Sequence, residues 1–420
     1  MLDLKGLRDF RTDSIRMDIL DSLDYAFRTS SPRKHVLEFL AHTGLRESGA
    51  RVFVVGFGKA AKEMFLGARE YFGDGIQNSA VIVPEYENSD SGEKFLHGGH
   101  PIPTEGSLSS SLSLLRTLKE LHEGDVVLVL ISGGGSSLFE VLREGVTLGE
   151  YNRAVSCVMK EGANIYELNS IRYLYSEVKG GGFLKYTYPA RVLSLIVSDV
   201  PGDDVDTVAS GPTGNPPGPD RVTEALRKYG DLCHLPPMPE RRVGQSSPCS
   251  NHIILRNRDF VDSVAERLKS RGYPVVNLDS GIQGSTKEVA SLLLGKMRES
   301  YDELGKGFFI VGGGETSTMR IGSAKGGRNL ELCLRILILL EGREEIHFAS
   351  IGTDGMDGSS DAMGAIVDNQ TLETLGKNRI MSHLSKSESL QPLLETKDVL
   401  FTGPTGTNLS DVFIAYYSKE

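Results

Sequence analysis

The segment Arg51–Ala60, RVFVVGFGKA, decides the fold of this chain. Its apolar run Val52–Val55 is typical of a buried parallel strand, which is apolar on both faces. Gly56 and Gly58 follow at once and predict a tight turn. The amphipathic stretch Lys59–Phe72 comes next and predicts a helix. A strand, a glycine turn and a helix in this order are the unit from which layered α/β domains are built.

The same alternation continues along the chain. Further strand-like runs stand at 80–83, 126–131 and 192–197, and a second helical stretch spans 105–121. Prolines become frequent between Thr213 and Pro248, and strand-like runs then resume from 253 onward. Because 420 residues exceed the about 250 to 300 at which a single core stops growing, we expect two domains. We predict an α/β protein of two layered domains, 1–240 and 241–420, with largely parallel or mixed sheets and an active-site cleft between them.

Composition and charge exclude several classes of function. Forty-six basic and fifty-six acidic residues give a net charge of −10 without a local basic patch, so we expect no nucleic-acid partner. The longest clean apolar run, Val126–Ile131, is too short to cross a bilayer, so we expect no membrane association and a cytoplasmic location. The four cysteines lie far apart without a C-x-x-C pair, which predicts reduced core thiols. His97 and His100 lack a third nearby ligand and are interpreted as loop histidines.

Glycine is more frequent than its usual ~7% of residues, at 48 of 420. Glycines let backbone N–H groups approach an anion, and the start of a helix adds a positive dipole end, so glycine turns in such positions predict phosphate sites. A single cluster is more often only a tight turn. Six clusters stand where a predicted strand ends or a predicted helix begins: Gly56–Lys59, Ser132–Ser136, Lys179–Gly182, Gly312–Glu315, Lys325–Arg328 and Gly352–Gly355.

Three of the clusters also carry charged side chains suited to phosphoryl transfer, which depends mainly on positioning and on charge neutralisation by Lys, Arg and a divalent metal. These side chains are Lys59, Arg328 beside Lys325, and Asp354 followed by Asp357 and Asp361. We expect Mg2+ or another divalent cation held by one or two carboxylates together with ATP phosphates and water. The motif G-x-x-x-x-G-K-[ST] does not occur, which excludes the P-loop kinases. The acidic candidates for metal ligand or base are Asp199, Asp203, Asp204, Asp206, Glu315, Asp354, Asp357 and Asp361.

Two other functions fit part of the pattern. Gly56-x-Gly58-x-x-Ala61 follows a predicted strand, and Glu85 ends the next one, which imitates the dinucleotide-binding fingerprint of a dehydrogenase. Glu85 is, however, further along the chain than the about 20 residues that the fingerprint requires, and Lys59 adds a charge that it does not use. A non-catalytic nucleotide-binding module would explain the glycines but not the accompanying Lys, Arg and Asp residues.

Ten motifs occur in the order known from one enzyme family. They are GFGKA from Gly56, HPIPTEGS from His100, LISGGGSSL from Leu130, LNSIR from Leu168, SDVPGDD from Ser198, ASGPT from Ala209, GGGETS from Gly312, GGRNLEL from Gly326, GTDGMDGSSDAMG from Gly352 and GPTGTN from Gly403. The chain thus resembles the glycerate 2-kinases of the MOFRL type, which were also labelled hydroxypyruvate reductases. The resemblance implies transfer of the ATP γ-phosphate to the 2-hydroxyl of D-glycerate, with NAD(P)-dependent hydroxypyruvate reduction as the alternative. Small molecules would be the partners, in a homodimer or a monomer.

The resemblance also implies roles for individual residues. Lys59 and Arg328 are expected to act in catalysis. As a separate hypothesis, Asp199 orients or deprotonates the attacking hydroxyl. The candidates for binding glycerate are Ser132, Gly133, Gly134, Ser136, Asn169 and Arg172, where an arginine fork suits a carboxylate. Asp354 and Glu315 are the expected metal ligands. The expected nucleotide-binding residues are Gly56, Gly58, Gly313, Gly314, Thr316, Lys325, Gly326, Gly327 and Asn329.

The chain departs from the family pattern at two places. Members commonly read Lys-His-Leu after LNSIR, where this chain has Tyr173, Leu174 and Tyr175. A common K-G-G-R-L is replaced by KGGGF from Lys179, which removes a basic residue. Both changes concern the expected acceptor contacts.

Overall fold

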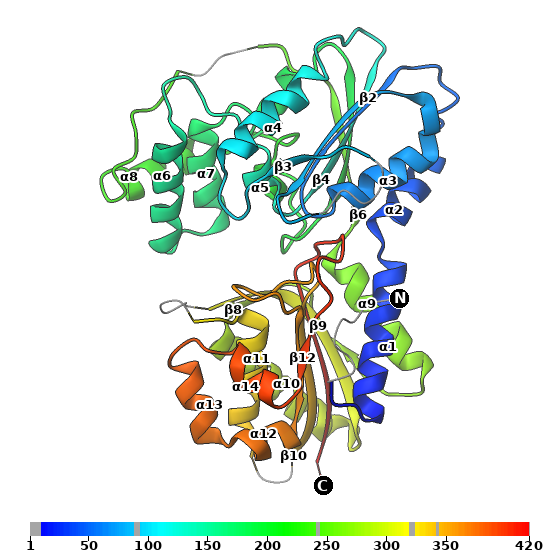
Figure 1. Ribbon diagram of the computed structural model, residues 1–420, viewed down its shortest axis with the longest axis vertical. Helices are drawn as coiled ribbons and strands as arrows, with labels where there is room; N and C mark the ends of the chain where they lie inside the picture. The colour runs from blue at the N-terminus through cyan, green and yellow to red at the C-terminus, as the bar shows by residue number, and fades with distance from the viewer. Residues whose placement is uncertain (1–9, 88–92, 241–243, 319–323, 342–343, 420) are drawn as a thin grey trace. The chain divides into compact units, whose positions relative to one another are not determined.

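The computed structural model describes residues 10–87, 93–240, 244–318, 324–341 and 344–419 (Figure 1). The chain forms two compact units. The parallel-sheet unit contains the described residues from 32 to 255, and the mixed-sheet unit combines those before 32 with those from 256 onward. Both are α/β layers, which confirms the predicted fold class.

The division differs from the predicted domains 1–240 and 241–420 at both ends. The strand β6 (Cys249–Leu255) pairs with β5 (Arg191–Val197), so the run expected to open the second domain closes the first sheet. The helix α1 (Ser14–Thr29) packs instead on α9 (Asn257–Ser270), with the ring of Phe27 edge-on to Phe260. The proline-rich segment 213–248, which we expected to link the domains, lies within the parallel-sheet unit. Prolines indicate the local backbone conformation and do not show which strands pair.

The parallel-sheet unit contains six strands in the order β3-β2-β1-β4-β5-β6, and every neighbouring pair is parallel. The strands not yet defined are β1 (Val52–Phe57), β2 (Ile76–Pro84), β3 (Leu96–Gly98) and β4 (Val126–Ser132). The chain winds from β1 toward β3 and then returns to place β4 on the other side of β1. The ends of β1 and β4 therefore form a topological switch point, where open α/β sheets bind ligands.

Helices cover both faces of this sheet. α2 (Pro32–Ala41) and α3 (Ala61–Phe72) pack together, with α3 on β1 and α2 on β6, while α4 (Glu105–Arg116) contacts β2 and β3 (Figure 1). Gly67 allows the close α2–α3 contact, because a Cβ there would lie 2.4 Å from the carbonyl oxygen of Arg33. Phe53, Val55 and Phe57 belong to the apolar cluster that also includes Leu114 of α4.

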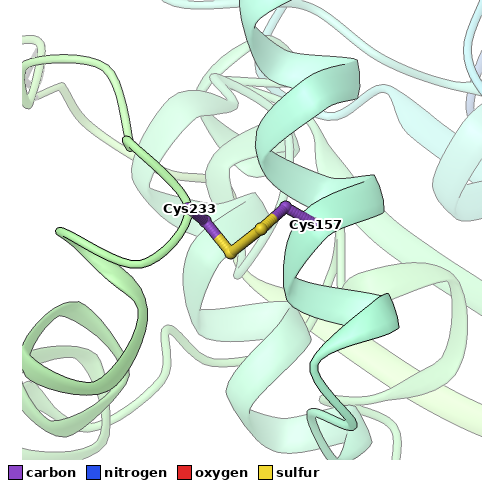
Figure 2. Close-up of a disulfide and its surroundings, with 2 residues drawn as sticks. All are labelled: Cys157 and Cys233. Atoms are coloured by element: carbon purple, nitrogen blue, oxygen red, sulfur yellow. A yellow bond between two sulfur atoms is a disulfide. The ribbon is translucent and has the colours of Figure 1, made fainter.

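Three further helices form a separate group with its own apolar cluster: α6 (Leu148–Lys160), α7 (Ile165–Tyr175) and α8 (Pro219–Tyr229). Cys157 of α6 and Cys233, which follows α8, form a disulfide (Figure 2). The prediction that all four cysteines are reduced thiols is therefore wrong for this pair. The two residues are 76 positions apart, and only the packing of α6 and α8 into one cluster brings them together. Cys249 and Cys333 are free.

The mixed-sheet unit has the strand order β12-β11-β10-β13-β9-β7, with β8 also pairing with β9. The pairs of β9 with β7 and β8 are parallel, and the others are antiparallel. The last strand along the chain thus lies in the centre of the sheet. The strands are β7 (Val275–Asn277), β8 (Ile282–Ser285), β9 (Phe308–Ser317), β10 (Glu344–Gly352), β11 (Gly364–Asp368), β12 (Val399–Leu400) and β13 (Asp411–Lys419).

Alternating residues of β9 direct the two faces of this sheet to different helices. Phe308 and Ile310 join the apolar cluster of α10 (Thr286–Leu304) and α11 (Arg328–Leu339). Phe309 packs edge-on against Tyr273, which follows α9. α12 (Asn369–Leu375), α13 (Lys377–Leu384) and α14 (Leu390–Glu395) complete the unit. In the described part of the chain, no helix has the length and apolar character needed to cross a membrane.

Candidate functional site

Two loops meet at the switch point of the parallel sheet. The turn after β1 and the loop after β4 are joined by hydrogen bonds from the Lys59 N–H to the Gly133 oxygen (2.9 Å) and from the Ala60 N–H to Ser132 Oγ (2.9 Å). Gly58 has φ of +129°, and a Cβ there would lie 2.1 Å from Ser132 Oγ. Only glycine permits this approach. The turn therefore fixes Lys59 beside the Ser132–Ser136 loop.

The same contacts oppose the dinucleotide-binding alternative. A pyrophosphate would need the N–H groups at the start of α3, but those of Lys59 and Ala60 already donate to the β4 loop, and that of Ala61 donates to Gly58. Glu85, the acid that would hold a ribose, accepts a hydrogen bond from the Thr104 hydroxyl (3.1 Å). The strand order suits a dinucleotide, but the donors that would bind one are engaged.

The Ser132–Ser136 loop presents a set of backbone donors. Within the described chain, the N–H groups of Gly133, Gly134, Gly135 and Ser136 have no hydrogen-bond partner. Gly134 is left-handed with φ of +83°, and the single helical turn α5 (Gly135–Leu138) follows. Successive N–H groups around a left-handed residue form a concave anion-binding nest. We call these four residues the amide nest.

Side chains from two further segments extend the nest. Ser136 Oγ lies 2.8 Å from Ser210 Oγ, and Ser210 donates to Asn169 Oδ1 (2.9 Å). Arg172, one turn further along α7, also donates to Asn169 Oδ1 (3.2 Å). Burial lowers the pKa of Arg172, although the neighbouring Tyr151 and Glu140 favour its charge. The six residues predicted to bind glycerate thus lie in one connected region.

His100 also belongs to this region, although the sequence interpretation treated it as an ordinary loop histidine. A Cβ at Gly134 would lie 3.2 Å from both His100 Cδ2 and Lys59 Cγ, so the imidazole and the lysine stem flank the nest. The motif HPIPTEGS was the signal that could have placed it there.

A cavity of about 90 Å³ opens beside the network. At roughly 10–15 Å³ per water-sized group it holds about six to nine such groups, which suits a small organic acid and not a nucleotide. Tyr173, at a position where the chain departs from its family, is part of the wall. Other lining residues include Asn169, Thr207, Ser210, Asn215 and Arg221.

In the Lys179 loop and in β9, glycine is required by close packing or local hydrogen bonding and not by an anion. In the Lys179 loop, the N–H groups of Gly180 and Gly181 donate to Ser210 and Gly211. Gly313 and Gly314 lie inside β9 rather than at its end, where a Cβ would come within 1.9 Å of Asn257 Oδ1 and of the Ile282 oxygen, respectively. Thr316 of the same strand is buried, and Gly56 is an interior residue of β1. The Gly313 N–H already donates to the Asp279 oxygen (3.3 Å).

The start of α11 is occupied by a carboxylate of the protein itself. Asp357 accepts hydrogen bonds from the N–H groups of Asn329 (3.1 Å) and Leu330 (2.9 Å), and burial raises its pKa to about 6. Gly327 makes this possible, because a Cβ there would lie 2.2 Å from Asp357 Cγ. The Gly326 and Gly327 N–H groups donate to serine hydroxyls. The N–H groups of Gly326, Gly327, Asn329 and Leu330 are therefore not available to a phosphate.

Arg328 is held by two carboxylates. Its guanidinium donates to Asp411 Oδ1 through Nη2 (3.0 Å) and to Glu315 through Nη1 (2.7 Å), and Nε lies 2.7 Å from Asp411 Oδ2 in an ion pair. Burial alone would lower the pKa of Arg328, but Asp411 and Glu315 raise it. Asp411 is fully buried at the start of β13 and also accepts from Asn329 Nδ2 (3.1 Å). The sequence interpretation missed Asp411, which lies outside the glycine clusters.

The structure gives fewer contacts for the predicted base, Asp199, and the predicted metal ligand Asp354. Asp199 follows β5, whose end pairs with the end of β4, and so lies at the same sheet edge as Ser132. Asp354 lies in the turn after β10 and accepts the Met356 N–H (3.1 Å). Among the described residues, the one cluster of three possible metal ligands within 4.8 Å is Asp13, His347 and Asp368. Arg11 and Arg16 already pair with Asp368, so this cluster is an ion-pair network.

Comparison with known proteins identifies the family of this chain. Residues 18–241 match the model of a domain of unknown function, DUF4147, and residues 308–411 match that of the MOFRL family. A glycerate 2-kinase of Picrophilus torridus is 35% identical over 421 residues, which cover 99% of this chain and 100% of the relative. A D-glycerate 2-kinase of Thermotoga maritima is 34% identical over 96% of this chain and 99% of its own length. The crystal structure of a glycerate kinase from the same organism superposes with a TM-score of 0.82 at 32% identity, over 97% of this chain and 100% of that one. The chain belongs to the family of MOFRL-type glycerate 2-kinases.

Proposed function

We propose that this protein transfers the γ-phosphate of ATP to the 2-hydroxyl of D-glycerate. Full-length relatives with this activity in their names support the reaction. The observation that carries the assignment within the chain is the amide nest, which Ser136 joins to Ser210 and Asn169, two residues that line a small cavity. Four N–H donors and a guanidinium are suited to a carboxylate, and the cavity has the size of a three-carbon acid.

The proposed roles follow from this placement. The nest and Arg172 bind the carboxylate of glycerate and thereby orient its 2-hydroxyl. Lys59, held beside the nest by the β1 turn, neutralises charge on the transferred phosphoryl group. Asp199 accepts the proton of the attacking hydroxyl. Arg328, oriented by Asp411, also acts on phosphate.

Mg2+ is proposed as the divalent cation. The carboxylates of Glu315 and Asp354 are the hard oxygen donors that such an ion prefers, and Glu315 is half exposed. When bound, the cation would neutralise phosphate charge. The ATP requirement also supports the proposed cytoplasmic location. The cleft between the two units stays a prediction.

A coupled assay tests the reaction. ATP and D-glycerate are supplied with enolase and pyruvate kinase but without phosphoglycerate mutase, so that only 2-phosphoglycerate gives pyruvate. We expect pyruvate from the wild-type protein and roughly a hundredfold lower turnover from Lys59→Ala. Lys160→Met, which alters an exposed lysine of α6, is the control and should retain wild-type turnover.

Two results would contradict the proposal. Pyruvate formed only after mutase is added would indicate phosphorylation at the other hydroxyl. Oxidation of reduced nicotinamide with hydroxypyruvate, in the absence of any phosphorylation, would favour the reductase.

A further inference from the structure

Lys179 is a buried cation beneath the amide nest. Its side chain is 1% exposed, and its ammonium donates to the carbonyl oxygens of Phe139 (2.5 Å) and Gly135 (3.4 Å). Gly135 is the first residue of the helical turn α5, and Phe139 directly follows its last residue. Lys179 forms no salt bridge with any described residue. The burial of an ammonium is costly, so a lysine in this position calls for an explanation beyond packing.

The peptide unit between Gly135 and Ser136 connects the ammonium to the nest. A trans peptide is planar, and its C=O and N–H groups point in opposite directions. The Gly135 oxygen points toward Lys179, so the Ser136 N–H of the same peptide points away from it and is one of the nest donors. A cation at the oxygen polarises the peptide and makes the opposite N–H a stronger donor. The contact at Phe139 holds the rest of the turn in place.

The charges around Lys179 leave it incompletely neutralised. Glu140 is near, but its carboxylate already accepts from Tyr151 Oη (2.7 Å) and from the Ser176 hydroxyl. Burial lowers the pKa of Lys179 to about 8, with Arg172 lowering it further and Glu140 opposing both. The neighbouring charged groups Arg143 and Glu177 have partners in Ser176, Tyr173 and Lys185.

We propose that Lys179 is the positioning residue of the anion site: its buried positive charge orients and polarises the amide nest and is completed electrostatically by the carboxylate bound there. This inference rests on the proposed function. It predicts that anion binding and protonation of Lys179 favour each other.

The direction of the pH effect follows from this coupling. A bound anion stabilises the ammonium and raises its pKa above that of the unliganded protein. Binding should therefore weaken as the pH rises above about 8, where the unliganded lysine begins to lose its proton. Between pH 7 and pH 9 we expect roughly a fivefold to tenfold loss of D-glycerate affinity, with proton uptake on binding at pH 9.

Isothermal titration of D-glycerate without ATP, at pH 7 and pH 9, tests the inference. Lys179→Met should bind at least about tenfold more weakly at pH 7, with similar affinities at both pH values, since no titrating charge remains. Lys179→Arg keeps a charge that does not titrate and should bind well at both values. Lys160→Met serves as the matched control and should reproduce the wild-type ratio. Titration at pH 9 in two buffers of different ionisation enthalpy measures the proton uptake.

The outcomes separate this inference from the function on which it rests. A purely structural role for Lys179 predicts a lower melting temperature for Lys179→Met with unchanged affinity. We expect the opposite, an unchanged or raised melting temperature with weakened binding, because the variant removes a buried charge. Wild-type affinity in a folded Lys179→Met protein, or equal wild-type affinities at both pH values, would overturn the inference while turnover in the coupled assay stands. Absence of wild-type phosphorylation would reject both.

Discussion

Asp411 lies outside every recognised motif, but it orients Arg328, which belongs to the GGRNLEL motif. Its buried carboxylate binds the Arg328 guanidinium through two nitrogens, which fixes the plane of the fork as well as its position. Glu315 provides the other contact but is 49% exposed and contributes less to the orientation. The geometry of Arg328 therefore depends mainly on the start of β13.

Replacing Asp411 by Asn tests this dependence. The amide keeps the size and one acceptor but loses the charge, so we expect kcat to fall at least about tenfold, because truncated buried charge pairs cost several kcal/mol. The KM for D-glycerate should change less than twofold, since Arg328 is assigned to phosphate. Steady-state kinetics measures both. Asp302→Asn, in an exposed pair with Lys419, is the control, and a wild-type kcat in Asp411→Asn would show that Arg328 needs no such partner.

The glycine clusters show that a sequence motif alone does not distinguish an anion-binding loop from a tightly packed one. Six clusters shared one composition, but a glycine that opens an anion site and a glycine that admits a neighbouring atom look identical in sequence. Gly327 admits Asp357, and Gly58 admits Ser132. Among the six glycine clusters, the Gly133–Ser136 stretch keeps a run of backbone donors without a partner in the described chain. The Ser132 loop, which carried fewer charged residues, is thus the best-formed anion site.

At the scale of elements, most strands and helices formed where their periodicity placed them. β1, β4 and β5 coincide with the predicted apolar runs, since parallel strands buried on both faces need such runs. The short strands β3, β8, β11 and β12 and the helices α12 to α14, which are too short to show a period, were not predicted. The longer helices α6, α7 and α10 were also not predicted. The pairing of α6 with the segment after α8 also had no local signal.

The disulfide supports a prediction about these elements. Closing a loop between residues 76 positions apart stabilises the chain by about 4 kcal/mol in the entropic description. Cys157→Ser, or reduction of the wild-type protein, should therefore lower the melting temperature, which calorimetry can measure. Reduction should have little further effect on Cys157→Ser. Cys249→Ser removes a free thiol and should behave like wild type, and an unchanged melting temperature in both variants would mean that the bond contributes nothing.

At the scale of the whole molecule, the connections between distant segments determine which unit each element joins. α1 leaves its sequence neighbours and packs on α9, and β13 enters the centre of a sheet whose first strand along the chain begins at Val275. Glu344 helps to connect such segments. It accepts from Arg298 of α10 (2.6 Å) and from Tyr417 of β13 (2.6 Å).

This network gives the molecule a predictable response to acid. Burial alone would raise the pKa of Glu344, but the hydrogen bonds from Arg298 and Tyr417 lower it to about 2. Its contribution, about 2 to 3 kcal/mol, is therefore complete above the unfolded pKa of about 4.5 and is lost as the pH falls toward 2. Glu344→Gln should be less stable than wild type at pH 7 by this amount and equal to it near pH 2. Urea unfolding at several pH values measures the difference, with the exposed Glu299→Gln as control. A difference that does not depend on pH would contradict the assignment.

The sequence by itself determined the α/β class, the strand–turn–helix unit at Arg51–Ala60, the family and the set of glycerate-binding candidates. These follow from short-range patterns of apolar residues, glycines and motifs, which act within a few residues along the chain. Tertiary structure alone decided the division at residue 255, the disulfide, the partnership of Asp411 with Arg328 and the choice among the glycine loops. Each of these depends on atoms that are distant in sequence and meet only on folding. A backbone N–H is available to a ligand only when it does not already donate a hydrogen bond to another part of the folded chain.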